Sequence, residues 1–153
     1  MRRILVQEAD FDAGTELVLL SNMDTGGIAS FIGVVRASGD DAGRITALTL
    51  QHYPGMAEKS IERIVAGAEG RWPLTGCTVI HRVGRLLAGE QIVFVGAASP
   101  NRKAALQATA FLIDWLKTRA PFWKAEEYTS GQTKWVDARA GDAVAADAWD
   151  KTS

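Results

Sequence analysis

The sequence predicts an α+β fold in which antiparallel sheets pack against helices. Three observations predict it. Short apolar, β-branched runs alternate with longer segments whose apolar residues recur at helical spacing. Neighbouring strand candidates are joined by short connections, which favours antiparallel pairing over a doubly wound parallel sheet. The chain has 153 residues, 47% of them hydrophobic and 23% charged, enough for one domain, 1–153, with its own core.

The expected strands are short apolar runs bounded by turn residues. They occupy residues 3–9, 28–36, 45–53, 77–83, 91–98, 122–128 and 134–136. The second of these runs ends on Arg36, at the entrance to a polar loop. Successive side chains of a strand point to opposite faces, so Phe122, Lys124 and Glu126 are expected to share one side of their strand.

The expected helices show apolar residues at spacings of three and four. They occupy residues 12–22, 57–72 and 100–120, and the alanine-rich tail, residues 140–153, is expected to form a loose helix. Helix 57–72 is expected to bury a stripe formed by Ala57, Ile61, Ile64, Val65, Ala68 and Trp72. For helix 100–120, Ser99 is the expected N-cap and Pro100 the first helical residue. The buried stripe of that helix is expected to consist of Leu106, Ala110, Ile113 and Leu116.

The composition excludes several classes of function. The formal net charge is −1 and the basic residues are spread along the chain, which argues against a nucleic-acid-binding surface. No apolar run approaches the roughly 20 residues of a membrane span, and the N-terminus becomes acidic at Glu8, too early for a secretory signal. The sequence has no nucleotide-binding glycine motif and no nucleophile elbow. We therefore expect a cytoplasmic protein.

The cysteine and the histidines give weak signals. Cys77 is the only cysteine, which excludes a disulfide framework and a multi-cysteine zinc site, so no metal site is expected. It lies in an apolar strand with no flanking cation, which favours a buried residue over a sulfur-carrying nucleophile. His81 alternates with Val79 and Val83 and is expected to be packed and hydrogen-bonded. His52 precedes a tight turn and is expected to be structural.

Cations gather at both ends of the third expected helix. Arg102 lies in its first turn, where free N–H groups attract anions but a cation is unfavourable for the helix itself. Lys117 lies beside the apolar stripe, and Lys124 lies on the next strand. Each of these, like Arg36, also has a simpler explanation as a solvated, salt-bridged or snorkelling side chain. If the fold brings all four into one pocket, mutual repulsion lowers the pKa of a lysine, and a bound phosphate offsets that repulsion.

Four segments resemble the large, catalytic subunit of molybdopterin synthase. They are FIGVVR at 31–36, LTLQHYPGM at 48–56, VIHRVG at 79–84 and LKTRAPFWK at 116–124. They occur in the family's order, and the similarity covers roughly residues 26–139. The resemblance implies an α/β hammerhead fold and a homodimer, each copy of which binds one small ubiquitin-like sulfur-carrier subunit, so that a heterotetramer forms.

The resemblance also implies a reaction. The small subunit's Gly-Gly C-terminus, as a thiocarboxylate, would enter a pocket of the large subunit. Two sulfurs would be transferred to cyclic pyranopterin monophosphate, which makes the dithiolene of molybdopterin in molybdenum cofactor biosynthesis. The large subunit is then a sulfurtransferase that needs no cofactor and no catalytic cysteine of its own.

The family's substrate-binding positions correspond here to Arg36, Asn101, Arg102, Lys117, Lys124 and Glu126. Lys117 and Lys124 resemble the family's two catalytic lysines, the first of them near the incoming tail. Asn101 stands where relatives commonly have histidine. Its amide can donate a hydrogen bond to a phosphate but cannot shuttle a proton near neutral pH. Val34 stands where a lysine can occur, which removes one possible cation.

Two other functions remain open at this point. The first is a non-catalytic module that carries a phosphate or pterin ligand in the same cationic pocket. The second is a sulfurtransferase that uses Cys77 as its nucleophile. The cationic residues fit the family's chemistry, because its substrate and its incoming protein tail are both anionic.

Overall fold

The computed structural model describes residues 1–136 and 140–150, and it confirms the α+β fold. The first sheet contains, in order, β1 (Arg2–Gln7), β4 (Gly76–Arg82), β6 (Gln91–Ser99) and β2 (Gly27–Val34). The second contains β5 (Gly84–Leu87), β3 (Ile45–His52), β7 (Phe122–Tyr128) and β8 (Thr133–Val136). The helices are α1 (Ala13–Leu20), α2 (Met56–Arg71), α3 (Arg102–Arg119) and α4 (Ala140–Asp150).

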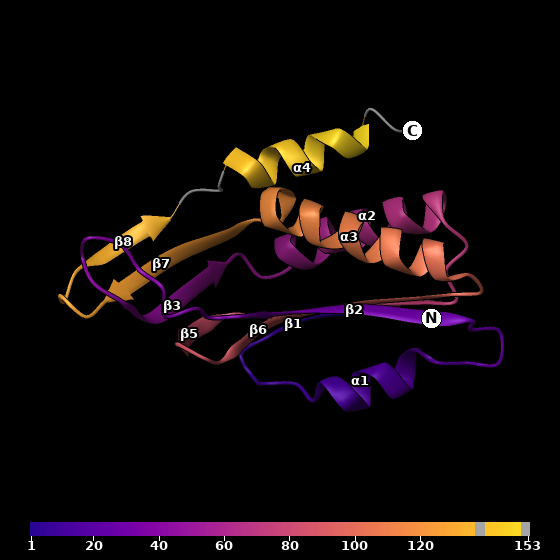
Figure 1. Ribbon diagram of the computed structural model, residues 1–153, viewed down its shortest axis with the longest axis horizontal. Coiled ribbons are helices and arrows are strands. Elements are labelled where there is room, and N and C mark those ends of the chain that lie inside the picture. Colours follow the sequence, from indigo (N-terminus) through magenta and orange to yellow (C-terminus); the bar gives the residue numbers. More distant parts are fainter. Residues whose placement is uncertain (137–139, 151–153) are drawn as a thin grey trace.

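The helices lie on both faces of the first sheet (Figure 1). α2 and α3 cover one face, where Ile61, Val65 and Leu112 pack with Val79 and Val95 in the main core. α1 covers the opposite face, where a smaller core cluster lies. The second sheet lies beyond the C-terminal end of α3, and α4 lies over α3 (Figure 1). None of the described helices combines the length and the hydropathy that a membrane span needs.

One strand pair departs from the predicted antiparallel arrangement. β1 pairs in parallel with β4, from Arg2 opposite Cys77 to Gln7 opposite Arg82. The other neighbouring strands in the described part of the chain pair antiparallel. A parallel pair needs a long crossover connection, which here consists of α1, β2, β3 and α2. The prediction of antiparallel pairing rested on short connections between successive strands, and β1 and β4 are not successive in the chain.

The N-terminus of α3 differs from the prediction. The helix begins at Arg102, and Asn101 rather than Ser99 is its N-cap, accepting a hydrogen bond on Oδ1 from the Ala104 N–H at 2.8 Å. Ser99 instead remains in β6, and its hydroxyl donates to the Pro73 carbonyl oxygen at 2.7 Å. The Ser99 hydroxyl oxygen accepts from the Asn101 N–H at 3.3 Å, one residue before the helix begins, and so does not cap its first turn.

The predicted buried stripe of α3 is also wrong in part. The buried residues are Ala104, Ala105, Ala108, Thr109, Phe111, Leu112 and Leu116. Leu106 is 58% exposed, Ala110 is exposed and Ile113 is only half-buried. The buried alanines have small side chains, which let α3 lie close to the sheet. Leu106 and Ala110 form a separate apolar stripe on the outward side of α3, whereas Ile113 packs against the edge of the main core. By contrast, the stripe predicted for α2 is buried from Ala57 to Ala68.

The tail forms α4 where the structure describes it. The Trp149 ring lies 5.6 Å from Trp72 and 5.5 Å from Phe111, and its indole N–H donates to Asp114 at 2.8 Å. The remaining residues of the predicted tail, 151–153, lie outside the described residues.

Candidate active site

A pocket of about 430 Å³ lies where the second sheet meets the end of α3. Its apolar walls come from both sheets and from α3. Its polar lining consists of Arg36, His81, Lys117, Thr118, Lys124 and Glu126. Four of the six predicted site residues, Arg36, Lys117, Lys124 and Glu126, therefore lie together in the described structure.

A short turn holds the two lysines on either side of the pocket. α3 ends at Arg119, Ala120 is extended, and Pro121 prevents the helix from continuing. β7 then begins at Phe122, whose N–H donates to the Ala120 carbonyl oxygen at 2.9 Å. Lys117 thus comes from the last turn of a helix and Lys124 from the strand directly after it.

The face of β7 that carries Lys124 and Glu126 is turned toward the pocket. Lys124 pairs with Leu50 of β3, and Glu126 pairs with Leu48. All four residues line the pocket, as does Phe122. The alternation predicted for residues 122, 124 and 126 is therefore confirmed, because one face of a strand carries every second side chain.

The charges in the pocket favour an anion. Arg36, Lys117 and Lys124 contribute three cations, whereas Glu126 contributes one carboxylate. The Glu126 carboxylate accepts a hydrogen bond from the Tyr128 hydroxyl at 3.3 Å, and burial, followed by the charge of Glu126, raises the pKa of Tyr128. The described residues contain no group of three or more histidine, cysteine or acidic side chains that could hold a metal ion.

The other two predicted site residues, Asn101 and Arg102, lie at the opposite end of α3. Lys117 follows Arg102 by fifteen positions, which at 1.5 Å per residue separates them by about 22 Å along the helix. The Asn101 side-chain oxygen is engaged in capping, which leaves its amide N–H₂ group to face outward as a donor. A single chain therefore does not bring all the predicted cations together.

Sequence reasoning did not assign His81 to the site. It is packed and hydrogen-bonded as expected, but it also lines the pocket. Its Nδ1 lies 2.9 Å from the Arg82 carbonyl oxygen, and its ring stacks on Phe122 with centroids 4.0 Å apart. Burial, together with the smaller effect of the nearby charges of Lys124 and Lys117, lowers its pKa to about 3. The alternation of β4 predicted a buried face, but no sequence signal indicated that this face borders a pocket.

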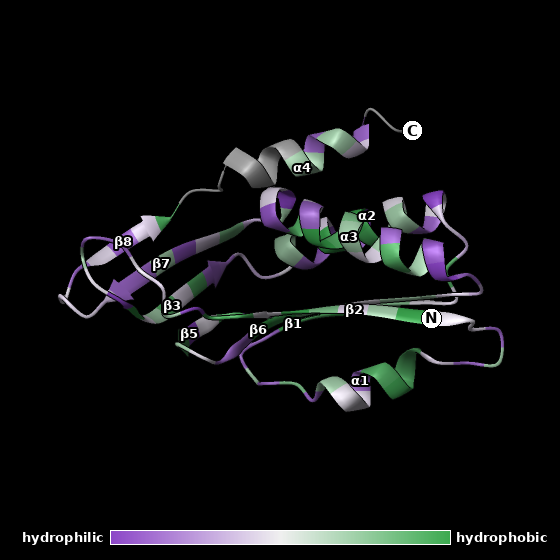
Figure 2. Cartoon of the chain, in the orientation of Figure 1, coloured by the Kyte–Doolittle hydropathy of each residue, from purple (hydrophilic) through white to green (hydrophobic). Residues whose placement is uncertain are grey.

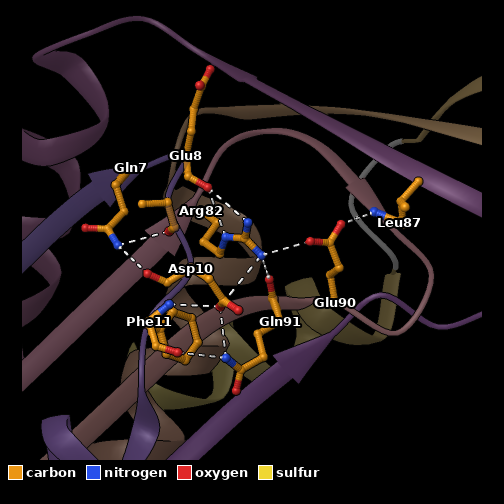
Figure 3. A network of polar contacts seen from close by, with 9 residues as sticks. Gln7, Glu8, Asp10, Phe11, Arg82, Leu87, Glu90 and Gln91 are labelled. Carbon is orange, nitrogen blue, oxygen red and sulfur yellow. Dashed lines mark hydrogen bonds and ion pairs between the residues drawn. The ribbon is translucent and has the colours of Figure 1, made fainter.

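Arg82 fixes the backbone next to His81 (Figure 3). Its buried guanidinium donates to the carbonyl oxygens of Glu8, at 3.0 and 3.1 Å, and of Gln91, at 2.9 Å. The carboxylates of Asp10 and Glu90 each lie 3.7 Å from the same group. These contacts tie the end of β4 to the ends of β1 and β6 and so hold this corner of the pocket in place.

Cys77 and His52 do not supply chemistry to this pocket. Cys77 is buried in β4, and desolvation, followed by the charge of Glu69, raises its pKa to about 12. A thiol with that pKa stays protonated and is a poor nucleophile. His52 lies at the end of β3, with its ring centroid 6.3 Å from that of Phe122.

Comparison with known proteins identifies the family. The family described as MoaE protein matches residues 6–119. The molybdopterin synthase catalytic subunit of Mesorhizobium japonicum is 48% identical over 153 residues, which cover 98% of this chain and 94% of that protein. The solved structure of the molybdopterin biosynthesis MoaE protein from Burkholderia ambifaria has a TM-score of 0.82 and 43% identity, covering 98% of this chain and 99% of that chain.

A more distant solved structure shares the fold. It is the protein–protein complex of subunits 1 and 2 of molybdopterin-converting factor from Helicobacter pylori, with a TM-score of 0.66 and 22% identity, covering 91% of this chain and 90% of that chain. The Burkholderia structure supports the hammerhead fold that the sequence resemblance implied. From the sequence matches over nearly its whole length, the chain belongs to the MoaE family of molybdopterin synthase catalytic subunits.

Proposed function

We propose that the cationic pocket is where this chain catalyses sulfur transfer in molybdopterin synthesis. Two sulfurs are transferred to cyclic pyranopterin monophosphate, each from one thiocarboxylated C-terminus of a small sulfur-carrier subunit. Family membership supports the reaction. The observation that supports the site is the presence of Arg36, Lys117 and Lys124 around one pocket.

Both reactants are anionic, and the pocket offers the cations that they need. Arg36 can bind a phosphate through two parallel N–H donors, a geometry that a lysine lacks. The apolar walls exclude part of the solvent, so each charge interaction is stronger than in bulk water. Lys124 and Glu126 share one face of β7 and can orient the pterin ring, the first as a donor and the second as an acceptor.

We assign Lys117 the role of stabilising the negative charge that develops during sulfur transfer. The thiocarboxylate sulfur bonds to a carbon of the substrate while a bond from that carbon to oxygen breaks and the oxygen takes the electron pair. A thioester then joins the carrier to the substrate. Water then adds to the thioester carbonyl, and collapse of the intermediate releases the carrier as a carboxylate and leaves the sulfur on the substrate. An ammonium group beside that carbonyl stabilises the oxyanion and can hand on a proton.

A second copy of the chain is needed to bring Asn101 and Arg102 to this pocket. β2 is an edge strand, and Figure 2 shows hydrophobic residues along it. The outward stripe of α3, formed by Leu106 and Ala110, lies on a helix that packs against β2. An unpaired apolar edge strand is a common site of pairing with another chain. We infer that β2 pairs antiparallel with β2 of the second copy.

The lengths of β2 and α3 support this pairing. The Gly26 N–H donates to the Ser99 carbonyl oxygen at 2.9 Å, so β2 begins where α3 begins. Val34, at the other end of β2, lines the pocket together with Lys117. β2 spans about 23 Å, close to the about 22 Å between Arg102 and Lys117. A two-fold axis midway between the two paired β2 strands therefore puts Arg102 of the second copy beside the pocket of the first.

The small subunit completes the assembly. Its glycine tail has no side chains to recognise, so the pocket must bind its backbone and its terminal charge. The Helicobacter structure, which is a complex of two subunits, is consistent with such a partner. We expect the assembly to act in the cytoplasm, where a reducing environment suits the free thiol of Cys77.

Reconstitution tests the proposed function. The purified chain is mixed with thiocarboxylated small subunit and cyclic pyranopterin monophosphate, and the dithiolene product is quantified. Product that depends on the chain and on the thiocarboxylate supports the proposal. Binding of the pyranopterin without product would instead indicate the non-catalytic carrier, and an unmodified carboxylate on the small subunit is the matched negative control.

A further inference from the structure

His81 lines the pocket, and the proposed function gives its ring no role. The side chain is only 6% exposed, and it lines the pocket. Its Nδ1 lies 2.9 Å from the Arg82 carbonyl oxygen. A carbonyl oxygen can only accept, so Nδ1 must carry the proton. In the neutral ring, Nε2 is then a hydrogen-bond acceptor.

The surroundings of His81 keep the ring neutral. Burial is the largest cause of its lowered pKa, and the charges of Lys124, Lys117 and His52 act in the same direction. The hydrogen bond to the Arg82 carbonyl acts in the opposite direction but does not outweigh them. At neutral pH, Nε2 therefore stays unprotonated and keeps its lone pair.

The orientation of the His81 ring, and with it that of Nε2, is fixed before a ligand binds. The His81 ring is stacked on Phe122, with an angle of 15° between the two planes. The side chain of the next residue, Arg82, is held by three hydrogen bonds to the carbonyl oxygens of Glu8 and Gln91, and the backbone of both residues is paired within the sheet. A ring held by stacking, by Nδ1 and by its backbone loses little entropy when a ligand binds to Nε2.

Acceptors are scarce in the pocket. Arg36, Lys117 and Lys124 can only donate, and the Thr118 hydroxyl donates to the Asp114 carbonyl oxygen at 3.2 Å. Among the polar side chains that line the pocket, the acceptors are His81, Glu126 and the oxygen of Thr118. A ligand made only of anionic oxygens has no use for a neutral, buried acceptor. A nitrogen heterocycle with N–H groups does.

We propose that His81 is a substrate-binding residue whose Nε2 accepts a hydrogen bond from an N–H group of the heterocycle in this pocket. The proposal rests on the proposed function of the pocket and adds the group that distinguishes a nitrogen heterocycle from a simple phosphate ester. It gives His81 no part in proton transfer, because a neutral ring with so low a pKa is a poor base.

Two substitutions separate the two ring nitrogens. In His81→Asn, the amide nitrogen occupies the place of Nδ1 and can still donate to the Arg82 carbonyl, but the acceptor at Nε2 is lost. In His81→Gln, the amide oxygen reaches the place of Nε2 and the Nδ1 donor is lost. We expect His81→Asn to weaken binding of cyclic pyranopterin monophosphate about 3- to 10-fold, the effect of one neutral hydrogen bond. His81→Gln should bind within about 2-fold of wild type.

The kinetic readout excludes a purely structural role. In His81→Asn, KM for the pyranopterin should rise while kcat stays nearly unchanged, because the lost contact belongs to substrate binding. Equal losses in both variants, a larger loss in His81→Gln, or a loss confined to kcat would overturn the proposal. The melting temperature of each variant shows whether the comparison is made on folded protein.

A measurement on the wild-type chain avoids substitution altogether. The sequence has two histidines, so ¹⁵N NMR of the imidazole nitrogens gives few signals. Cyclic pyranopterin monophosphate should shift the Nε2 signal of His81, whereas inorganic phosphate should leave it in place. An unchanged Nε2 signal with bound pyranopterin would overturn the proposal. Wild-type dithiolene formation is measured in parallel, and its absence would refute the proposed function instead.

Discussion

Lys117 of α3 and Lys124 of β7 line the same pocket from the two sides of the turn at Pro121. The helix must stop at this proline, and the strand must begin at once, for both lysines to line one pocket. The sequence alone marked this stretch as unusual, because packing requires its aromatic residues and its proline but not two lysines.

Replacing either lysine by alanine should nearly abolish dithiolene formation. Removing one group that stabilises developing charge lowers kcat by about 10²- to 10³-fold in other enzymes. Lys117 is exposed, so its loss should leave the melting temperature almost unchanged. The rate is measured in the reconstituted reaction, and Lys59→Ala, a change of an exposed lysine on α2, is the matched control. Wild-type rates in Lys117→Ala and Lys124→Ala would remove both lysines from the mechanism.

Cys77→Ala should keep nearly full activity. The thiol is buried and its raised pKa keeps it protonated, so it has no part in the proposed reaction. The loss of one buried sulfur atom should lower the free energy of unfolding by about 1 kcal/mol. Activity and chemical denaturation are both measured. A folded variant that makes no dithiolene would favour the cysteine-dependent sulfurtransferase instead.

Leu106→Glu should separate the two copies of the chain. The side chain is 58% exposed on the outward stripe of α3, so a charge there disturbs an interface rather than the core. Sedimentation should show monomers, and dithiolene formation should fall because Arg102 of the second copy is lost. Val18→Glu, on the exposed part of α1, introduces the same charge at a residue that is 75% exposed and should leave the oligomeric state unchanged. Dimers of Leu106→Glu with full activity would contradict the inferred pairing of β2.

Arg82→Met should destabilise the fold much more than Arg85→Met. Arg82 is buried and satisfies the carbonyl oxygens of Glu8 and Gln91, so its removal should cost about 1–3 kcal/mol. Arg85 forms an exposed ion pair with Glu127 and should contribute little. Thermal unfolding of the two variants measures the difference. Equal melting temperatures would mean that the network in Figure 3 does not stabilise this corner.

The buried face of a helix could be predicted from the sequence when the helix has a single apolar side. α2 has a single stripe, from Ala57 to Ala68, and the helical spacing identified it. α3 has two apolar sides, and spacing alone cannot tell which of them faces the sheet. The spacing predicted that the larger residues Leu106 and Ile113 are buried, but Ala104, Ala105 and Ala108 are buried instead.

The sequence predicted the relative placement of only those residues of the candidate site that lie close together in the chain. Phe122, Lys124 and Glu126 follow from strand alternation, and Lys117 follows from its place next to Pro121. His81 was missed because a buried histidine looks the same in sequence whether it borders a core or a pocket. Arg102 could not be placed, because its distance from Lys117 depends on α3 being one straight element and on a second copy of the chain.

Mixed dimers test the central claim, that sulfur transfer occurs where Lys117 of one copy meets Arg102 of another. Lys117→Ala and Arg102→Ala chains, each nearly inactive alone, are unfolded together, refolded and assayed for dithiolene. Half of the dimers are then mixed and each mixed dimer has one intact site, so activity should return to about a quarter of the wild-type rate. Activity that stays at the level of the separate variants would contradict the claim.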